Sequence, residues 1–83
     1  MPTVFRRGPL RIVIYPADHR PAHVHAIGPD GEAVFNLNCP VGPSELRENF
    51  GLKRRALATI ERLINANVNE LCRAWGDIHG VAQ

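Results

Sequence analysis

The fold is decided by the stretch HVHAIGPDGEAVFNL, residues 23–37. On each side of its centre, apolar residues recur at every second position, as they do in strands with one buried face. The centre is the turn sequence Gly-Pro-Asp-Gly at 28–31, in which proline presets φ and Asp-Gly accepts a left-handed backbone. The stretch therefore predicts a β-hairpin with strands at 23–27 and 32–37.

Two further strands are expected on either side of this hairpin. Residues 11–15 are β-branched and aromatic and predict a strand that Pro16 ends. The loop at 16–21 that follows is stiffened by a proline at each end. Residues 44–50 fit either a single helical turn capped by Ser44 or an edge strand, and the spacing of Leu46, Glu48 and Phe50 favours the strand.

The last third of the chain has apolar residues at helical spacing. They form two stripes: Ala56, Leu57, Ile60, Leu63 and Ile64, then Val68, Leu71, Cys72, Trp75 and Ile78. Asn67 followed by Glu70 matches a capping box, so we expect one helix to end near Ala66 and another to begin near Asn67. Gly76 is expected to fray the second helix early. Strands followed by helices predict an α+β fold: an antiparallel three- to four-stranded sheet followed by two C-terminal helices packed on one face.

The composition indicates a single domain over residues 1–83 with a thin core. The net charge is only +2, so the field of the whole molecule is weak evidence for nucleic-acid binding. Neither a secretory signal nor an apolar run long enough to span a bilayer is expected, which predicts a cytoplasmic protein. Cys39 and Cys72 are accordingly expected to be reduced thiols.

Alternation along the strands assigns side chains to the two faces of the sheet. The face under the helices is expected to hold Leu10, Ile12, Ile14, Ala22, Val24, Ala26, Ala33, Phe35 and Leu37. The opposite, open face carries Arg11, Tyr15, His23, His25 and Asn36. This polar face is the candidate working surface.

His23 and His25 lie on one side of one strand, roughly 6.5–7 Å apart. Asp18 and His19 come just before them in the stiff loop. One interpretation is general acid–base chemistry on a phosphodiester, with Arg11 or Arg20 stabilising the charged state. A second is a metal site formed by the two histidines with Asp18 or His19. A third is that the histidines are ordinary surface residues.

Basic residues occur at two other places. Lys53, Arg54 and Arg55 fall in the first turn of the first helix, where a phosphate or an acidic partner binds well, although a solvated face is the alternative. Arg6 and Arg7 form a basic arm that touches nucleic acid or a partner, or simply frays. Trp75 is expected in the core, and His79 has no assigned catalytic role. No phosphate-binding glycine loop is present, and no cofactor is expected.

Several landmarks together resemble a small bacterial family catalogued as domain of unknown function 4160. They are the N-terminal MPTVFR, Asp18-His19 followed by PAHVH at 21–25, Gly31-Glu32-Ala33, NFGL at 49–52, IERLI at 60–64, and Trp75. The family typically has two prolines before the first histidine, where this chain has Pro21-Ala22, and often tryptophan in place of Asn36. The resemblance implies a setting similar to toxin–antitoxin pairs, with this chain as the toxin half and a cognate small antitoxin-like protein as partner.

Two hypotheses follow. In the first, the chain is a toxin-like ribonuclease or related phosphodiesterase. Its candidate catalytic residues are His23, His25, Arg11, Tyr15, Asp18 and His19, and its candidate RNA- or partner-binding residues are Arg20, Lys53, Arg54 and Arg55. In the second, the chain is a non-enzymatic protein-binding or regulatory module that docks a cognate partner. A homodimer is compatible with either hypothesis.

Overall fold

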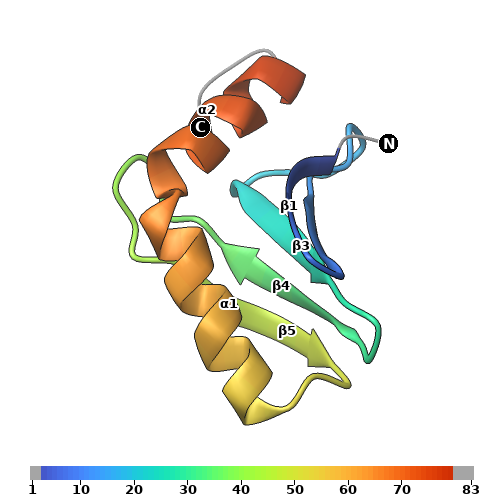
Figure 1. Ribbon diagram of the computed structural model, residues 1–83. Coiled ribbons are helices and arrows are strands. Elements are labelled where there is room, and N and C mark those ends of the chain that lie inside the picture. Colours follow the sequence, from blue (N-terminus) through green and yellow to red (C-terminus); the bar gives the residue numbers. More distant parts are fainter. Residues whose placement is uncertain (1–2, 80–83) are drawn as a thin grey trace.

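The computed structural model describes residues 3–79, and over this range the chain forms five strands followed by two helices (Figure 1). The strands are β1 (Thr3–Arg7), β2 (Leu10–Val13), β3 (His23–Ile27), β4 (Glu32–Asn36) and β5 (Glu45–Phe50). The helices are α1 (Arg54–Ala66) and α2 (Val68–His79). The predicted α+β class, with an antiparallel sheet followed by two helices, is confirmed, and the strand number is corrected from three or four to five.

The sheet is an antiparallel meander in which each strand pairs with the next, in the order β1-β2-β3-β4-β5. The predicted hairpin forms its centre, with His23 opposite Asn36 and His25 opposite Val34. On the other side of β3, His25 lies opposite Val13 of β2. Because directly opposed residues of an antiparallel pair share a face, both histidines lie on the face that carries Val34 and Asn36.

Strand β1 is the strand that the sequence-based prediction missed. Its residues had been interpreted as a basic arm, because Val4 and Phe5 are too few to give a periodic signal. In the structure Arg6 lies opposite Arg11, and Gly8, with φ of +57°, turns the chain from β1 into β2. Of the N-terminal landmark residues, Met1 and Pro2 lie outside the described range.

The two helices lie on the same side of the sheet and enclose the core with it (Figure 1). The break between them falls at Asn67, as predicted, and the Asn67 amide side chain donates a hydrogen bond to the Leu63 carbonyl at 2.9 Å. Gly76 does not fray α2, which continues to His79. The core consists of Ile12, Ile14, Ala22, Val24, Ala26, Ala33, Phe35, Leu37, Ile60, Ile64, Leu71 and Trp75. Neither of the helices described within residues 3–79 has the length and apolarity to cross a membrane.

The expectation of reduced thiols is wrong in this structure, because Cys39 and Cys72 form a disulfide. The loop after β4 runs beside α2 and brings the two Cα atoms to 5.8 Å, within the range that a disulfide spans. The cysteines are 33 residues apart, so their proximity depends on how α2 docks and cannot be read from local patterns. The disulfide ties α2 to the end of β4.

The polar face of the sheet is less open than the sequence indicated. Val13 and Val34 are buried on it, and so is His23. The loop at 16–21 supplies Ala17 and Asp18 to a hollow whose floor holds the histidines, so this loop lies over the face. The predicted edge strand is confirmed: β5 is the last strand of the sheet, and all six of its residues are exposed.

Candidate functional site

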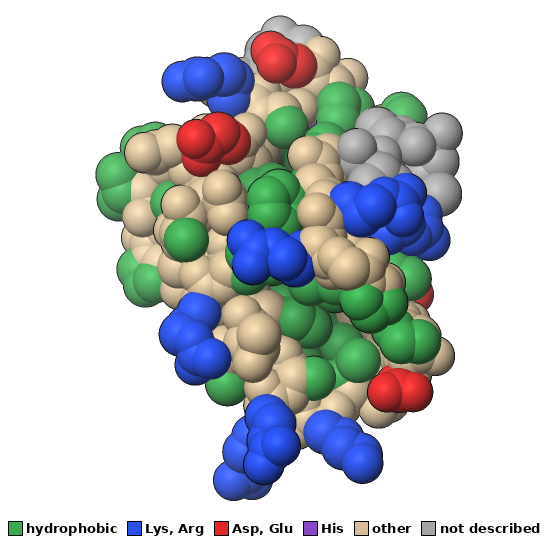
Figure 2. Space-filling view, in the orientation of Figure 1, with side chains coloured by type: hydrophobic (Ala, Val, Ile, Leu, Met, Phe, Trp, Pro, Cys, Tyr) green, Lys and Arg blue, Asp and Glu red, His purple; other side chains and the backbone are tan. Residues whose placement is uncertain are grey.

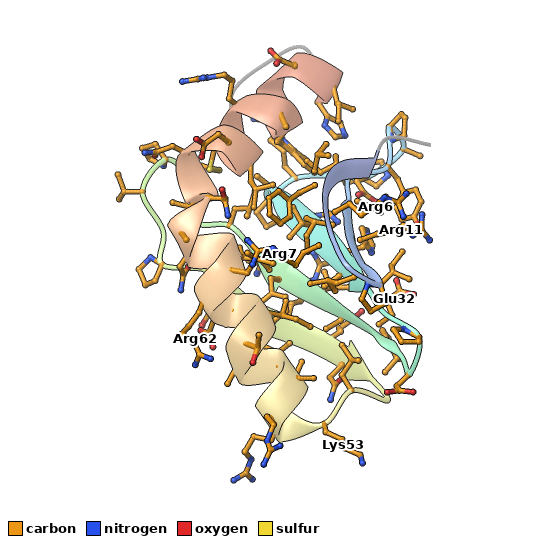
Figure 3. All side chains as sticks on the ribbon, viewed as in Figure 1. Arg6, Arg7, Arg11, Glu32, Lys53 and Arg62 are labelled. Atoms are coloured by element: carbon orange, nitrogen blue, oxygen red, sulfur yellow. A yellow bond between two sulfur atoms is a disulfide. The ribbon has the colours of Figure 1, made fainter. Side chains whose placement is uncertain are left out.

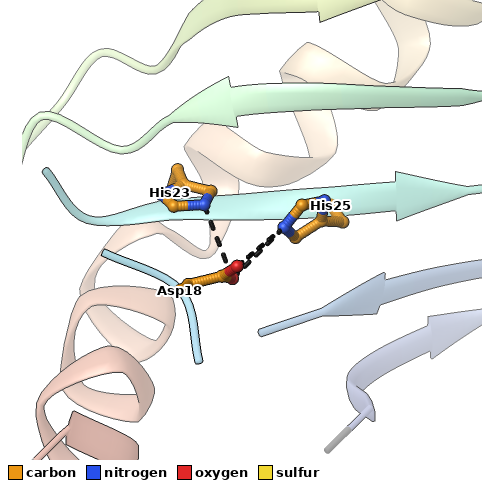
Figure 4. Close-up of side chains that lie close together, drawn as sticks. All are labelled: Asp18, His23 and His25. Carbon is orange, nitrogen blue, oxygen red and sulfur yellow. Dashed lines mark hydrogen bonds and ion pairs between the residues drawn. The ribbon is translucent and has the colours of Figure 1, made fainter. Parts of the chain in front are cut away.

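The site is a cluster of Asp18, His23 and His25 (Figure 4). Strand alternation places the two imidazoles on one side of β3, with their ring centroids 5.2 Å apart. The loop before β3 places the Asp18 carboxylate between them. Asp18 Oδ2 lies 3.4 Å from His23 Nε2 and 3.2 Å from His25 Nε2. One carboxylate oxygen therefore faces the Nε2 atoms of both rings.

The turn that follows β2 orients the Asp18 carboxylate. The Asp18 backbone N–H donates to the Tyr15 carbonyl at 3.0 Å, and the Tyr15 backbone N–H donates back to Asp18 Oδ2 at 3.1 Å. Side chain–backbone bonds of this kind are what favour aspartate in turns. With 15% of its side chain exposed, Asp18 is held mostly out of solvent. A short polar turn thus presents a fixed carboxylate oxygen to the sheet.

His23 is oriented by the backbone just before it. Its Nδ1 lies 2.8 Å from the Pro21 carbonyl oxygen, which can only accept, so Nδ1 carries the proton and donates. In the neutral ring Nε2 then holds a lone pair, and this lone pair points toward Asp18. The side chain is only 6% exposed, and its ring packs against Trp75 with a centroid distance of 5.3 Å.

His25 lies between two carboxylates. Its Nε2 is 3.2 and 3.4 Å from the two oxygens of Asp18. Its Nδ1 is 3.4 Å from Glu32 Oε2 but makes no hydrogen bond there in the described structure. The Tyr15 ring meets the His25 ring edge-on at 4.7 Å. Glu32 reaches His25 because β4 runs antiparallel to β3, which places the two residues on neighbouring strands.

The cluster forms the floor of a hollow of about 270 Å³. Two exposed cations, Arg20 from the loop and Arg47 from β5, line the same hollow. A second hollow of about 250 Å³ shares Asp18, His19 and Arg20 and is closed by Trp75 and His79 of α2. The site is thus a small polar pocket that holds a buried His23, a half-buried His25 and two exposed guanidinium groups.

Among the predicted site residues, His23, His25, Asp18, His19 and Arg20 line this pocket, and Tyr15 does not line it but packs against the His25 ring. Arg11 does not line it and instead lies beside Arg6 on the neighbouring strands β1 and β2 (Figure 3). Lys53, Arg54 and Arg55 are exposed at the start of α1, and Lys and Arg side chains gather there in Figure 2. Lys53 and Arg55 line a different, apolar hollow of about 380 Å³ between α1 and the turn after β3.

The sequence analysis missed three members of the site. Glu32 approaches His25 only through the pairing of β3 with β4, and Arg47 approaches only through the pairing of β4 with β5. Trp75 had been assigned to the core, where it does lie, but its ring also packs on His23. The Glu32 contact was within reach of the predicted hairpin, since the register fixes which β4 residues lie near His25.

The fold and the site define a small α+β domain that carries a half-buried histidine–carboxylate pocket on a five-stranded meander. Within that class the chain belongs to the family Domain of unknown function (DUF4160), whose model matches residues 10–76. The matched range contains the whole cluster and both helices up to Gly76. Searches of curated proteins and of solved structures give no match.

Proposed function

We propose that this protein cleaves phosphodiester bonds of RNA at the pocket formed by Asp18, His23 and His25. The observation that carries the proposal is the convergence of two imidazoles on one carboxylate beneath a rim of two arginines. Imidazole and carboxylate groups in this arrangement can accept and return protons at neutral pH. The guanidinium groups of Arg20 and Arg47 would bind the anionic phosphate above the imidazole and carboxylate groups.

The proposed reaction is balanced within the substrate. The cluster accepts the proton of a ribose 2′-hydroxyl, and the 2′-oxygen forms a bond to the adjacent phosphorus. The bond from phosphorus to the 5′-oxygen breaks, and the departing oxygen receives a proton from the pocket. The products are a 2′,3′-cyclic phosphate and a free 5′-hydroxyl. The guanidinium groups at the rim would stabilise the extra negative charge that develops on the phosphoryl oxygens.

The test is cleavage of a labelled RNA by purified protein. Asp18→Asn keeps the shape of the side chain and removes its charge, so we expect kcat/KM to fall by about 100-fold or more while folding is kept. Arg47→Ala is expected to weaken RNA binding and to flatten its salt dependence. Arg62→Ala, an exposed arginine on α1 outside the pocket, is the matched control.

Expression in cells should give the same result as the cleavage assay with purified protein. As a toxin-like enzyme, the wild type should arrest growth on induction, with RNA fragments ending in cyclic phosphates, and Asp18→Asn should do neither. If Asp18→Asn and wild type cleave RNA at the same rate, the pocket is not the site of reaction. A DNA strand of the same sequence should be uncut, because it lacks the 2′-hydroxyl.

A cognate small protein is proposed as the partner, and β5 is where it would dock. Of the two edge strands of the described sheet, β1 and β5, β5 is the one that lines the pocket, and its exposed side chains include Leu46 at 43% and Phe50 at 58%. Exposed edge strands accept an added strand from another chain. Since Arg47 and Glu48 of β5 also line the pocket, a strand added there would lie at the pocket rim and would inhibit the enzyme.

The same edge also favours the second candidate function, a docking module without catalysis. Copurification of the chain with small proteins from its own cells tests the docking, and Phe50→Ser should weaken any complex that forms. Val41→Ser, at a still more exposed apolar residue outside β5, is the control that should leave it intact. A tight complex together with no turnover of RNA by the free chain would establish the docking module and refute the enzyme.

A further inference from the structure

We infer that Asp18, His23 and His25 bind a divalent transition-metal ion of the zinc type. The inference rests on the geometry of the cluster and deepens the proposed function by naming its cofactor. Each residue offers one donor atom, and the three donors lie within 4.8 Å of one another. Two imidazole nitrogens and one carboxylate oxygen are a ligand set that zinc binds in catalytic sites while keeping a fourth position for water.

The separations of the donors fit such an ion. Two ligands about 2.0–2.1 Å from a tetrahedral centre are about 3.3–3.4 Å apart. The separations from Asp18 Oδ2 to His23 Nε2 and to His25 Nε2 are 3.4 and 3.2 Å. The remaining edge, between the two histidine donors, is at most 4.8 Å, so the two rings would approach each other by up to about 1.4 Å to share one tetrahedral ion.

The hydrogen bonds around His23 favour a positive charge between its Nε2 and the Asp18 carboxylate. Its Nδ1 donates to the Pro21 carbonyl, so the neutral ring turns a lone pair toward a carboxylate oxygen. Two acceptors facing each other at 3.4 Å in a site this buried repel, unless a cation or an extra proton lies between them. A backbone carbonyl that receives the outer N–H is the usual support of a metal-bound histidine.

The contacts of His25 also favour a cation bound in the pocket. If its Nε2 carries the proton and donates to Asp18, its Nδ1 faces Glu32 Oε2 at 3.4 Å with no proton between them. If Nε2 instead binds an ion, the proton moves to Nδ1 and Glu32 can accept it. That carboxylate–histidine–metal relay is common in zinc sites.

A bound ion would give the pocket its base. Zinc lowers the pKa of its bound water to about 7, so a hydroxide can occupy the fourth position at neutral pH. An ion held by Asp18, His23 and His25 would thus supply general-base chemistry for the proton of the 2′-hydroxyl. His23 and His25 are then ligands, and they hold the ion in place of exchanging protons themselves.

The experiment is metal binding by protein made without a histidine tag and stripped with a chelator. Zinc content after dialysis and the visible spectrum of added Co(II) are measured for wild type, Asp18→Asn, Glu32→Gln and Asp77→Asn. Wild type should hold one ion per chain and give the intense bands of tetrahedral Co(II). Glu32→Gln should weaken affinity by about 10–100-fold and Asp18→Asn by more, whereas Asp77→Asn, at an exposed aspartate of α2 that does not line the pocket, should keep the ion.

Each outcome decides the inference. The isosteric variants are expected to fold, which thermal melting verifies, so loss of the ion from Asp18→Asn would support the site. Equal zinc binding by wild type and Asp18→Asn, or no binding at micromolar zinc, would overturn the inference. An extra proton between His23 Nε2 and the Asp18 carboxylate would then account for their close approach. The proposed function is judged separately: metal bound without RNA cleavage refutes only the enzyme, and cleavage by metal-free protein in chelator refutes only the metal.

Discussion

Replacing Cys39 and Cys72 together by serine should remove a large part of the stability of this domain. The disulfide closes a loop between residues 33 apart, and the chain-entropy relation gives roughly 4 kcal/mol for a loop of that length. A chain of 83 residues has only about 4–12 kcal/mol of total stability. The expected fall in Tm is therefore about 15–30 °C.

The assay is urea and thermal unfolding of wild type, oxidised and with reductant, beside the double variant. Reduced wild type should unfold where the double variant does, and reductant should not affect the variant. The thiol content of oxidised and reduced wild type is verified by alkylation. If their free energies of unfolding differ by less than about 1 kcal/mol, the expected contribution of the disulfide is refuted. The cytosol keeps thiols reduced, so alkylation in intact cells would also show whether Cys39 and Cys72 are disulfide-bonded or free in the cell.

Two other predictions concern the stability of the fold that supports the site. Phe35→Ala should destabilise the protein by about 3–5 kcal/mol in urea unfolding, because Phe35 is buried at the centre of the core, and a loss below about 1 kcal/mol would contradict that packing. Gly31→Ala should destabilise by about 1–3 kcal/mol, because the added Cβ would collide with the backbone of Phe50 and Gly51. Gly28→Ala, at the other end of the same turn, meets no atom closer than 3.9 Å and should change stability little; equal effects of the two alanines would show that the turn is packed differently.

The parts of the fold that the sequence predicted are those determined locally. The hairpin of β3 and β4 follows from two alternating segments around Gly28–Gly31, and the helix break at Asn67 follows from the end of one apolar stripe and the start of another. β1 was missed because its pairing with β2 supplies the order that its own two apolar residues do not indicate. The disulfide was missed because it depends on the docking of α2 beside the loop after β4.

The site was predictable to a similar extent. Two histidines at alternate positions of a strand must share a face, and a short proline-bounded loop keeps Asp18 near them. The Pro21 carbonyl and Arg47 were not predictable, because they reach the pocket through a loop conformation and through the pairing of β4 with β5, whereas the Glu32 contact follows from the predicted hairpin. The Pro21 carbonyl also decides what His23 can do, since it fixes which nitrogen of that ring carries the proton.

The most direct test of the Asp18–His23–His25 pocket as the working centre is anomalous diffraction at the zinc edge, from crystals of untagged protein grown with zinc. The account predicts one strong peak about 2.0–2.2 Å from a carboxylate oxygen of Asp18 and from Nε2 of both histidines, with Glu32 near His25 Nδ1. No peak there, with zinc bound instead at surface residues, would contradict it.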